Sequence, residues 1–448
     1  MFNTIRNAFR VPELRKKIWF TLAMLLVFRF GAHIPVPFIQ KEGMEAFLAG
    51  GGTDLFSLFN AFTGGAFANA TVMALGVSPY INASIIIQLL AVAIPALERL
   101  SKEGAEGRKK INKITRYVGI VLALIQGAGL YITLNNMEVE ASRAGQVLDI
   151  VKNGTLEFII ITLTFTAGTA FVVWLGEQIT EKGIGNGVSL IIFAGIISSI
   201  PQGIQAVYTQ FLGTGFSVVG TVKVAAIAIL ALLAIVLVVF FDAAERRIPV
   251  QYAKRVVGRK MYGGQSTNIP IKVVSGGVMP IIFASSIMAF PATVVRLASS
   301  GNMPGADSIW YTVLGCLTSG FGPDWTEIVY GVLYFLLIIF FTYFYSAIQF
   351  NPVEMANNMK KSGGYIPGYR PGKPTSDYIG KVSSRLNLAG AFFLGIIAVL
   401  PVVMGAVFKM PGIQIGGTSL LIMEGVALES VRQIESQLVM RNYKGFLE

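Results

Sequence analysis

Charged residues are scarce in this sequence. They make up 13% of the 448 residues, whereas hydrophobic residues make up 54%; soluble globular chains carry about 25% charged residues. In a chain of 48.3 kDa, so few charged residues are not enough to form the surface of a soluble protein. The single cysteine, Cys316, excludes an internal disulfide, and the high apolar content excludes intrinsic disorder. Long apolar runs such as 225–241 and 330–341 instead indicate an all-α polytopic membrane protein.

Groups suited to covalent or metal chemistry are also few. The only histidine is His33, and the sequence has no carboxylate pair or Cys/His cluster at the spacing of a metal site. The glycine-rich stretch 183–187 lacks the lysine of a phosphate-binding loop, so a tight turn between helices explains it better. The ionisable residues inside apolar runs are Arg29, Lys223 and Glu424, a poor set for an ion-coupled transporter. We therefore expect no catalytic residue, no metal and no cofactor.

Ten segments are long and apolar enough to cross a bilayer, which takes roughly 20 helical residues. They are 18–37, 72–95, 117–136, 155–175, 188–206, 218–241, 273–296, 327–348, 386–408 and 418–434. The apolar run of the first segment is longer than the core of a cleavable signal peptide. We therefore expect this first segment to remain as a membrane anchor.

The positive charges are concentrated in alternate connections. Of the 36 Lys and Arg residues, 29 lie before the first span, at or beyond the end of the last, or in a loop that follows an even-numbered span. Short loops rich in Lys and Arg stay on the cytoplasmic side of a membrane. Both termini are therefore predicted to be cytoplasmic, as an even number of spans also requires.

A nine-residue pattern occurs twice. Residues 76–84 (GVSPYINAS) and 277–285 (GVMPIIFAS) agree at six positions; chance agreement between apolar segments is the alternative explanation. The copies fall in the second and seventh spans, as a duplication of five spans would place them, and an odd number of spans inverts the second copy. Inverted repeats commonly place a transport path between the two halves. A path lined by these two spans, constricted by aliphatic side chains and gated by dewetting, is the first functional hypothesis.

Residues 53–65 predict a short helix. It begins at Thr53 or Asp54, which can cap an N-terminus, and ends at Gly64 and Gly65. About three turns cannot cross a bilayer. The helix either lies in the membrane interface or re-enters the bundle beside a cavity.

Two predicted cytoplasmic loops are long, at about 242–272 and 349–385. Apolar alternation from Ile248 predicts a strand or hairpin in the first loop. The glycine- and proline-rich stretch 363–372 predicts a stiff turn that presents Arg370. Basic loops of this size suit docking to an acidic partner or to RNA phosphates.

Taken together, these stretches resemble the SecY family, the channel subunits of bacterial protein translocases. The resemblance runs along the whole chain and is most specific at 75–90 (LGVSPYINASIIIQLL), 101–116, 183–195, 246–255, 277–290, 351–372 and 416–422. On overall impression the sequence is most similar to SecY of Gram-positive bacteria. The resemblance implies two inverted five-helix halves, 1–206 and 207–448, around a central pore. It also implies a lateral gate between the second and seventh helices, and a plug helix at about 53–66.

The resemblance also assigns individual residues to these parts. The pore ring would be formed by Val77, Ile81, Val188, Ile192, Ile282 and Ile422. The polar positions of the lateral gate would be Asn82, Gln88, Ser285 and Ser286. The plug would include Asp54, Leu55, Phe56, Leu58, Phe59, Phe62, Gly64 and Gly65. Docking of a SecA motor or a ribosome would use Arg246, Arg247, Lys254, Arg255 and Arg370.

The function implied by this resemblance is a channel rather than an enzyme. It would secrete unfolded preproteins across the bacterial plasma membrane and release membrane proteins laterally into lipid. Expected partners are SecE and SecG subunits, the SecA motor ATPase, the ribosome, signal peptides, unfolded preproteins and membrane lipids. The alternative is a secondary transporter of a small solute built on inverted repeats.

Overall fold

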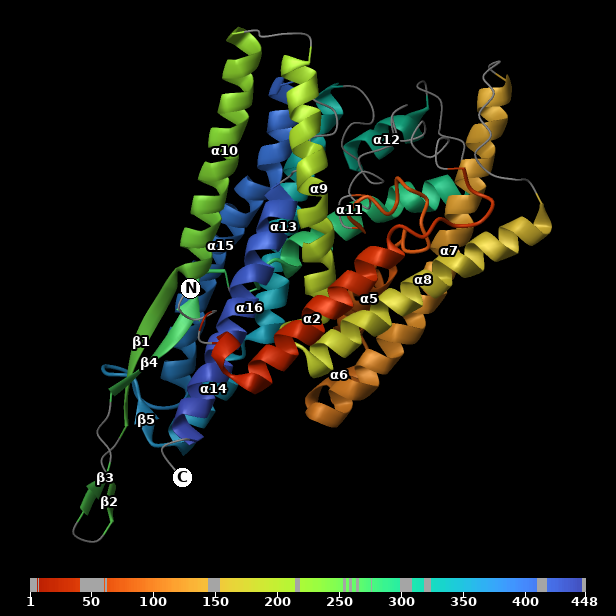
Figure 1. The fold of residues 1–448 in the computed structure, drawn as a ribbon. Coiled ribbons are helices and arrows are strands. Elements are labelled where there is room, and N and C mark those ends of the chain that lie inside the picture. Colours follow the sequence, from red (N-terminus) through yellow and green to blue (C-terminus); the bar gives the residue numbers. More distant parts are fainter. Residues whose placement is uncertain are drawn as a thin grey trace.

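Helices dominate the structure (Figure 1). The computed structural model describes residues 6, 8–40, 60, 63–143, 154–213, 218–252, 255–257, 260–262, 266–274, 276–298, 308–317, 324–408 and 417–444. A small group of strands extends from the same end of the helical bundle as α14 (Figure 1).

The helices of the N-terminal part are α2 (Pro12–Gly31), α5 (Ser78–Ala93), α6 (Pro95–Lys102), α7 (Ala105–Arg143), α8 (Thr155–Lys182) and α9 (Gly187–Leu212). Those of the C-terminal part are α10 (Val218–Ala243), α11 (Met279–Ala298), α12 (Ile309–Leu317), α13 (Asp324–Gln349), α14 (Pro352–Lys361), α15 (Lys373–Phe408) and α16 (Gly417–Lys444). The strands are β1 (Glu245–Tyr252), β2 (Arg255–Val257), β3 (Lys260–Tyr262), β4 (Ser266–Lys272) and β5 (Gly364–Tyr365).

Six helical stretches of the described residues are long and apolar enough to cross a membrane. They are Glu106–Ile132, Thr155–Lys182, Gly187–Thr209, Gly220–Ala243, Trp325–Lys361 and Lys373–Leu400. The pair α5 and α6, bent by 107° beside Pro95, brings the number to seven if it is counted as one span. Each of the ten predicted ranges overlaps a described helix, and 72–95 also includes the first residue of α6. The chain is a membrane protein with several apolar helices.

Some predicted boundaries were wrong. The first span was placed at 18–37, but α2 ends at Gly31, and the second was placed from 72, but α5 begins at Ser78. Between these helix ends the backbone pairs with itself instead: Val36 N–H donates to Ala70 O at 2.9 Å and Val72 N–H to Ile34 O at 2.9 Å. The second long loop is also shorter than predicted, because α15 begins at Lys373 with a proline in its first turn, where proline is tolerated.

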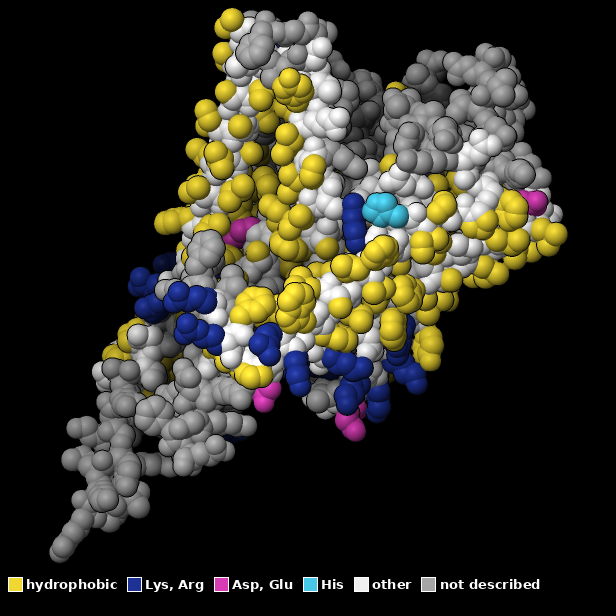
Figure 2. Space-filling model, viewed as in Figure 1, with side chains coloured by type: hydrophobic (Ala, Val, Ile, Leu, Met, Phe, Trp, Pro, Cys, Tyr) yellow, Lys and Arg dark blue, Asp and Glu magenta, His cyan; other side chains and the backbone are white. Residues whose placement is uncertain are grey.

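The exposed surface of the helices is largely apolar. On α10, Val218 is 82%, Leu232 65% and Phe240 68% exposed, a pattern expected where a helix faces lipid or a membrane-embedded partner. In Figure 2, hydrophobic side chains cover the helical shafts, while Lys and Arg side chains gather towards one end of the visible face. This charge distribution is the one expected of a bundle whose two ends lie on opposite sides of a bilayer.

Helix neighbours follow the same order in the two parts of the chain. In the N-terminal part α5 packs on α7, α7 on α8 and α8 on α9; in the C-terminal part α11 packs on α13, α13 on α15 and α15 on α16. The largest apolar cluster joins α11, α13 and α15 and also contains Ile85 of α5, with Ile81 and Leu89 packed against it. These three residues are spaced by four along α5, so they form one stripe of the helix that contacts the C-terminal part.

The β platform is a three-stranded sheet in the order β4-β1-β5. β1 and β4 pair antiparallel, with Ile248 opposite Ile269, which confirms the hairpin predicted from the apolar alternation. β5 comes from the second long loop and pairs with β1 at Gln251 opposite Tyr365. The two loops, more than 100 residues apart in the sequence, therefore fold as one unit.

Candidate functional site

The repeated sequence pattern has a repeated backbone conformation. Gly76 and Gly277 take the left-handed conformation, with φ of 54° and 56°, which favours glycine. Each is followed two residues later by the start of a helix, α5 at Ser78 and α11 at Met279, with a proline in the first turn. The first-turn bonds also correspond, because Ile81 N–H donates to Val77 O at 3.0 Å and Ile282 N–H donates to Val278 O at 3.3 Å.

All six predicted ring residues lie in one apolar cluster, the ring cluster. Its buried members include Val77, Ile192 and Ile422, and the half-buried residues packed against it include Ile81, Val188 and Ile282. They come from α9, α11, α16 and α5 with its N-cap residue. None of the six carries a polar side-chain atom, so the surface on which they meet cannot form a specific hydrogen bond to another molecule.

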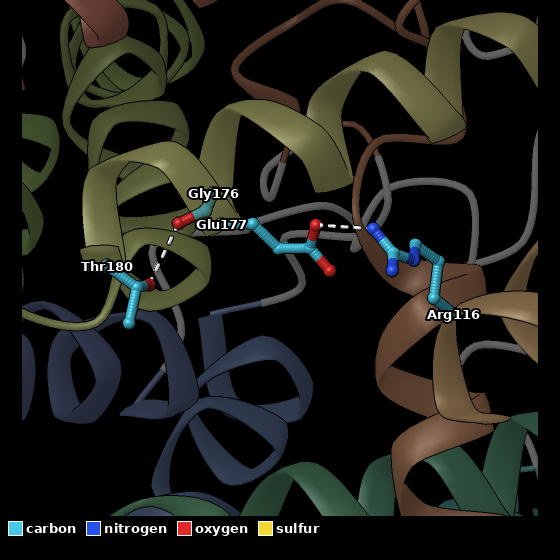
Figure 3. Close-up of polar contacts among 4 residues, drawn as sticks. All are labelled: Arg116, Gly176, Glu177 and Thr180. Carbon is cyan, nitrogen blue, oxygen red and sulfur yellow. Dashed lines mark hydrogen bonds and ion pairs between the residues drawn. The ribbon is translucent and has the colours of Figure 1, made fainter. Parts of the chain in front are cut away.

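The start of α9, which carries Val188 and Ile192, is fixed by polar contacts. Asn186 Oδ1 caps the helix, accepting from Val188 N–H at 3.1 Å and Ser189 N–H at 3.3 Å. Thr180 Oγ1 accepts from Gly187 N–H at 2.9 Å and donates to Gly176 O at 2.8 Å (Figure 3). The stretch 183–187 is thus a tight turn between α8 and α9, as the sequence predicted.

An ion pair joins α7 to α8 near this turn. Arg116 Nη1 lies 2.9 Å from Glu177 Oε2, one turn of helix before Thr180 (Figure 3). Thr21 Oγ1 of α2 accepts from Ile184 N–H at 3.1 Å, which ties a third helix to the same turn. The loop that precedes the ring residues of α9 is therefore held by contacts with α2 and α8. The ion pair between Arg116 and Glu177 fixes α8 to α7.

On α16, the residue two positions after Ile422 is Glu424, an acidic residue inside a predicted span. Its Oε1 is buried and has no hydrogen-bond partner among the described residues. It lines a small cavity of about 20 Å³ together with Asp242, Val278 and Gly425. Asp242 is paired with Arg432 at 2.9 Å, which links α10 to α16. In the part of the chain that the structure describes, no three His, Cys, Asp or Glu side chains gather as a metal site would require.

The four predicted gate residues are half-buried on α5 and α11. Gln88 Nε2 donates to Ser84 Oγ at 3.1 Å, and Ser285 Oγ donates to Ile282 O at 3.0 Å. Both bonds stay within one helix. Asn82 and Ser286 lie on the same two helices.

Only the last residues of the predicted plug are described. Asp54, Leu55, Phe56, Leu58, Phe59 and Phe62 lie outside the described residues. Gly64 and Gly65 have φ of 65° and 86°, and Gly65 N–H donates to Asn60 O at 2.9 Å. Such a bond across five residues, with a left-handed glycine, is the usual end of a helix.

Of the predicted docking residues, three are described with their side chains. Arg246 and Arg247 are exposed on β1, and Arg247 Nε lies 2.7 Å from Glu245 Oε1. Arg370 is exposed, and its backbone carbonyl accepts from Thr375 Oγ1 at 2.8 Å. Lys254 lies outside the described residues, and Arg255 is described as part of β2.

The β platform that carries these arginines is rigidly packed. Ile248, Val250 and Ile271 of the hairpin share one apolar core with Met359, Ile366 and Ile379 of the second loop and α15. Tyr365 Oη donates to Gln251 Oε1 at 2.9 Å, and the rings of Tyr369 and Tyr378 stack at 4.2 Å. The basic side chains are therefore presented from one packed body.

Two contributors were missed by the sequence analysis. Val278 packs against the ring cluster, and the repeat could have identified it because it corresponds to Val77. Arg29 was noted only as an ionisable residue inside a span, but its Nη1 donates to Gly64 O at 2.7 Å. Its partner is a backbone carbonyl, for which the sequence carries no signal.

The chain is similar to known proteins in both sequence and structure. The profile of the SecY family matches residues 71–431. The protein translocase subunit SecY of Streptomyces galbus is 45% identical over 456 residues, covering the whole of both chains. A solved structure described as a protein conducting channel has a TM-score of 0.64 at 18% identity and covers 97% of each chain. Sec61 in a canine ribosome–channel complex from the endoplasmic reticulum has a TM-score of 0.61 at 17% identity, again over 97% of each chain.

Proposed function

Because the chain belongs to the SecY family of protein translocase subunits, we propose that it forms a channel for unfolded preproteins across the bacterial plasma membrane. The same channel releases membrane proteins sideways into lipid. It is a channel subunit rather than a catalyst. The alternative interpretation, a secondary transporter of a small solute, finds no support among these relatives.

The observation that carries this proposal is the ring cluster. Six aliphatic side chains from four segments, three of them buried and three half-buried, belong to one apolar cluster, and an apolar constriction excludes water and ions. Because these side chains offer no hydrogen bonds, a translocating chain of any sequence would pass without being held at a particular residue. The proposed pore ring thus consists of Val77, Ile81, Val188, Ile192, Ile282 and Ile422.

The proposed architecture has ten membrane spans in two inverted halves, 1–206 and 207–448. The matching backbone at Gly76 and Gly277 and the matching order of helix neighbours support the duplication. The gathering of Lys and Arg at one end supports cytoplasmic termini. The lateral gate would lie between α5 and α11, lined by Asn82, Gln88, Ser285 and Ser286, and residues 53–66 would form the plug.

The proposed partners divide by surface. The β platform, with Arg246, Arg247, Lys254, Arg255 and Arg370, would dock the SecA motor or the ribosome; a ribosome complex is among the structural relatives. Exposed apolar helix faces such as that of α10 would contact SecE, SecG and membrane lipids. Signal peptides and unfolded preproteins would enter through the pore and the gate.

The ring is tested by replacing Ile81 and Ile282 together with asparagine. Polar side chains at these equivalent positions should hydrate the constriction and raise the resting ion conductance of vesicles containing the channel. We expect an increase of about tenfold, which corresponds to a barrier lowered by about 1.4 kcal/mol.

The chain offers a matched control for this experiment. Ile86 and Ile287 stand at equivalent positions of the same two helices, and each is 37% exposed. The Ile86→Asn/Ile287→Asn variant should conduct like the unmodified channel. Equal conductance of the two double variants would rule out the ring assignment.

A further inference from the structure

Arg29 places a positive charge on α2 two residues before the helix ends at Gly31. A guanidinium within a membrane-spanning helix is costly unless it finds an acceptor. Here the acceptor is Gly64 O, at 2.7 Å from Nη1. The bond joins two segments 35 residues apart in the sequence, and it is charge-assisted, which makes it stronger than a bond between neutral groups.

Gly64 occupies a narrow slot between two helices. A Cβ at this position would lie 2.9 Å from Arg29 Nη1 on one side and 2.9 Å from Gly195 O of α9 on the other, and would collide with Ser198 Oγ. Ser198 Oγ also lies 3.5 Å from Gly64 O. With a φ of 65°, Gly64 fits the slot both by its conformation and by its lack of a side chain.

The segment after Gly65 has anchoring contacts that do not involve Arg29. Phe67 is 1% exposed and lies in an apolar cluster with α7 and α8 residues. Thr71 Oγ1 donates to Ala66 O at 3.0 Å, and Val72 N–H donates to Ile34 O. These contacts fix the chain from Phe67 towards the ring residue Val77. Gly65 is tied to this segment, because its carbonyl accepts from Asn69 N–H at 3.2 Å and from Asn69 Nδ2 at 2.8 Å, whereas the carbonyl of Gly64 accepts from Arg29 of α2.

We propose that Arg29 is a positioning residue: it holds the joint at Gly64 and Gly65 against α9 and so fixes the boundary between the proposed plug and the anchored segment that leads to the pore ring. This inference rests on the proposed function for the role of the plug. The contact itself is independent of it. Ser198 completes the slot from α9, and the conformation of the joint depends on the guanidinium from α2.

The test is amide hydrogen exchange of residues 63–70 in the full channel embedded in lipid nanodiscs. Arg29→Ala should raise the exchange rate in this region about tenfold, because the joint loses its strongest external bond. Arg29→Lys keeps a charged donor and should give an intermediate rate. Lys223→Ala removes another basic residue inside a predicted span, one whose Nζ lies over the Phe211 ring, and should leave the rate unchanged.

A second variant covers the case in which Arg29→Ala does not fold. Gly64→Ala keeps Arg29 but fills the slot, and it should raise exchange in the same region. Unchanged exchange in a folded Arg29→Ala channel, or in Gly64→Ala, would overturn the inference.

Resting ion conductance of the same variants separates this inference from the proposed function. Faster exchange with raised conductance supports both. Faster exchange with unchanged conductance supports the joint and contradicts the role of residues 53–66 as a plug.

Discussion

At the scale of single residues, glycine allows a helix and a neighbouring segment near the ring to approach each other closely. Gly168 of α8 faces Val72 O, and a Cβ at Gly168 would collide with this carbonyl. Val72 lies in the anchored segment that leads to Val77. Gly331 of α13 is different, because a Cβ there would meet only Val399 Cγ1, at 3.6 Å.

Gly168→Ala is therefore predicted to destabilise the channel by about 1–3 kcal/mol, the usual cost of overpacking. The collision is with backbone, so it cannot be relieved by rotating a side chain. Thermal unfolding of the purified protein measures the effect. Gly331→Ala, the control, should unfold near the unmodified temperature; a Gly168→Ala melting temperature no lower than that of the control would contradict the close approach.

The sequence predicted some residues and contacts of the site but not others. Ile81 and Ile282 could be predicted to be equivalent because the repeat marks both with the same glycine, valine and proline. The hydrogen bond between Arg29 and Gly64 could not be predicted, since one partner is a carbonyl available at every position. For Glu424, the sequence showed a charge inside an apolar run but not that Asp242 shares its cavity, because this depends on how α10 meets α16.

At the scale of elements, hydropathy predicted where helices lie better than where they end. Apolar residues continue past Gly31 and precede Ser78, so the sequence favoured helix there. The observed ends are set by backbone pairing between 34–36 and 70–72, which depends on tertiary structure. The β hairpin was predicted because its alternation is local, whereas its pairing with β5 has no local signal.

At the same scale, the proposed docking role of the β platform can be tested at Arg370. Arg370→Glu should abolish SecA-driven translocation of a preprotein into vesicles, because reversing an exposed charge turns attraction to an acidic surface into repulsion. The fold should be unaffected, since the side chain is exposed. Translocation is measured as protease-protected preprotein.

Lys373→Glu provides the control, because Lys373 is an exposed basic residue three positions away, at the start of α15. It should retain most of the activity. Normal translocation by Arg370→Glu would exclude Arg370 from docking, whatever the control does.

At the scale of the whole molecule, the two proposed halves meet where α9 packs on α16, where α7 packs on α11 and along one stripe of α5. Ile81, Ile85 and Leu89 pack against the apolar cluster of α11, α13 and α15. On α5 this contact is made by aliphatic side chains, and the hydrogen bonds from Gln88 to Ser84 and from Ser285 to Ile282 stay within their own helices. Separation of α5 from α11 would therefore break none of these hydrogen bonds.

Locking α5 to α11 is thus predicted to stop transport. Cysteines replacing Asn82 and Ser286, in a Cys316→Ser background that removes the native thiol, would be joined by a short reducible cross-linker. Translocation should fall at least tenfold, a barrier increase of about 1.4 kcal/mol, and should recover on reduction. The single-cysteine variants treated in the same way are the controls, and full activity with the helices joined would refute the gate.

The β platform has a mechanical consequence. β4 ends at Lys272 and α11 begins at Met279, so a short connection links the sheet to the helix that carries Ile282. At its other edge the sheet holds the loop that presents Arg370, and β1 follows directly from α10. A force that a docking partner applied to the β platform would therefore reach the first turn of α11, and with it the proposed ring residue Ile282, through this short connection.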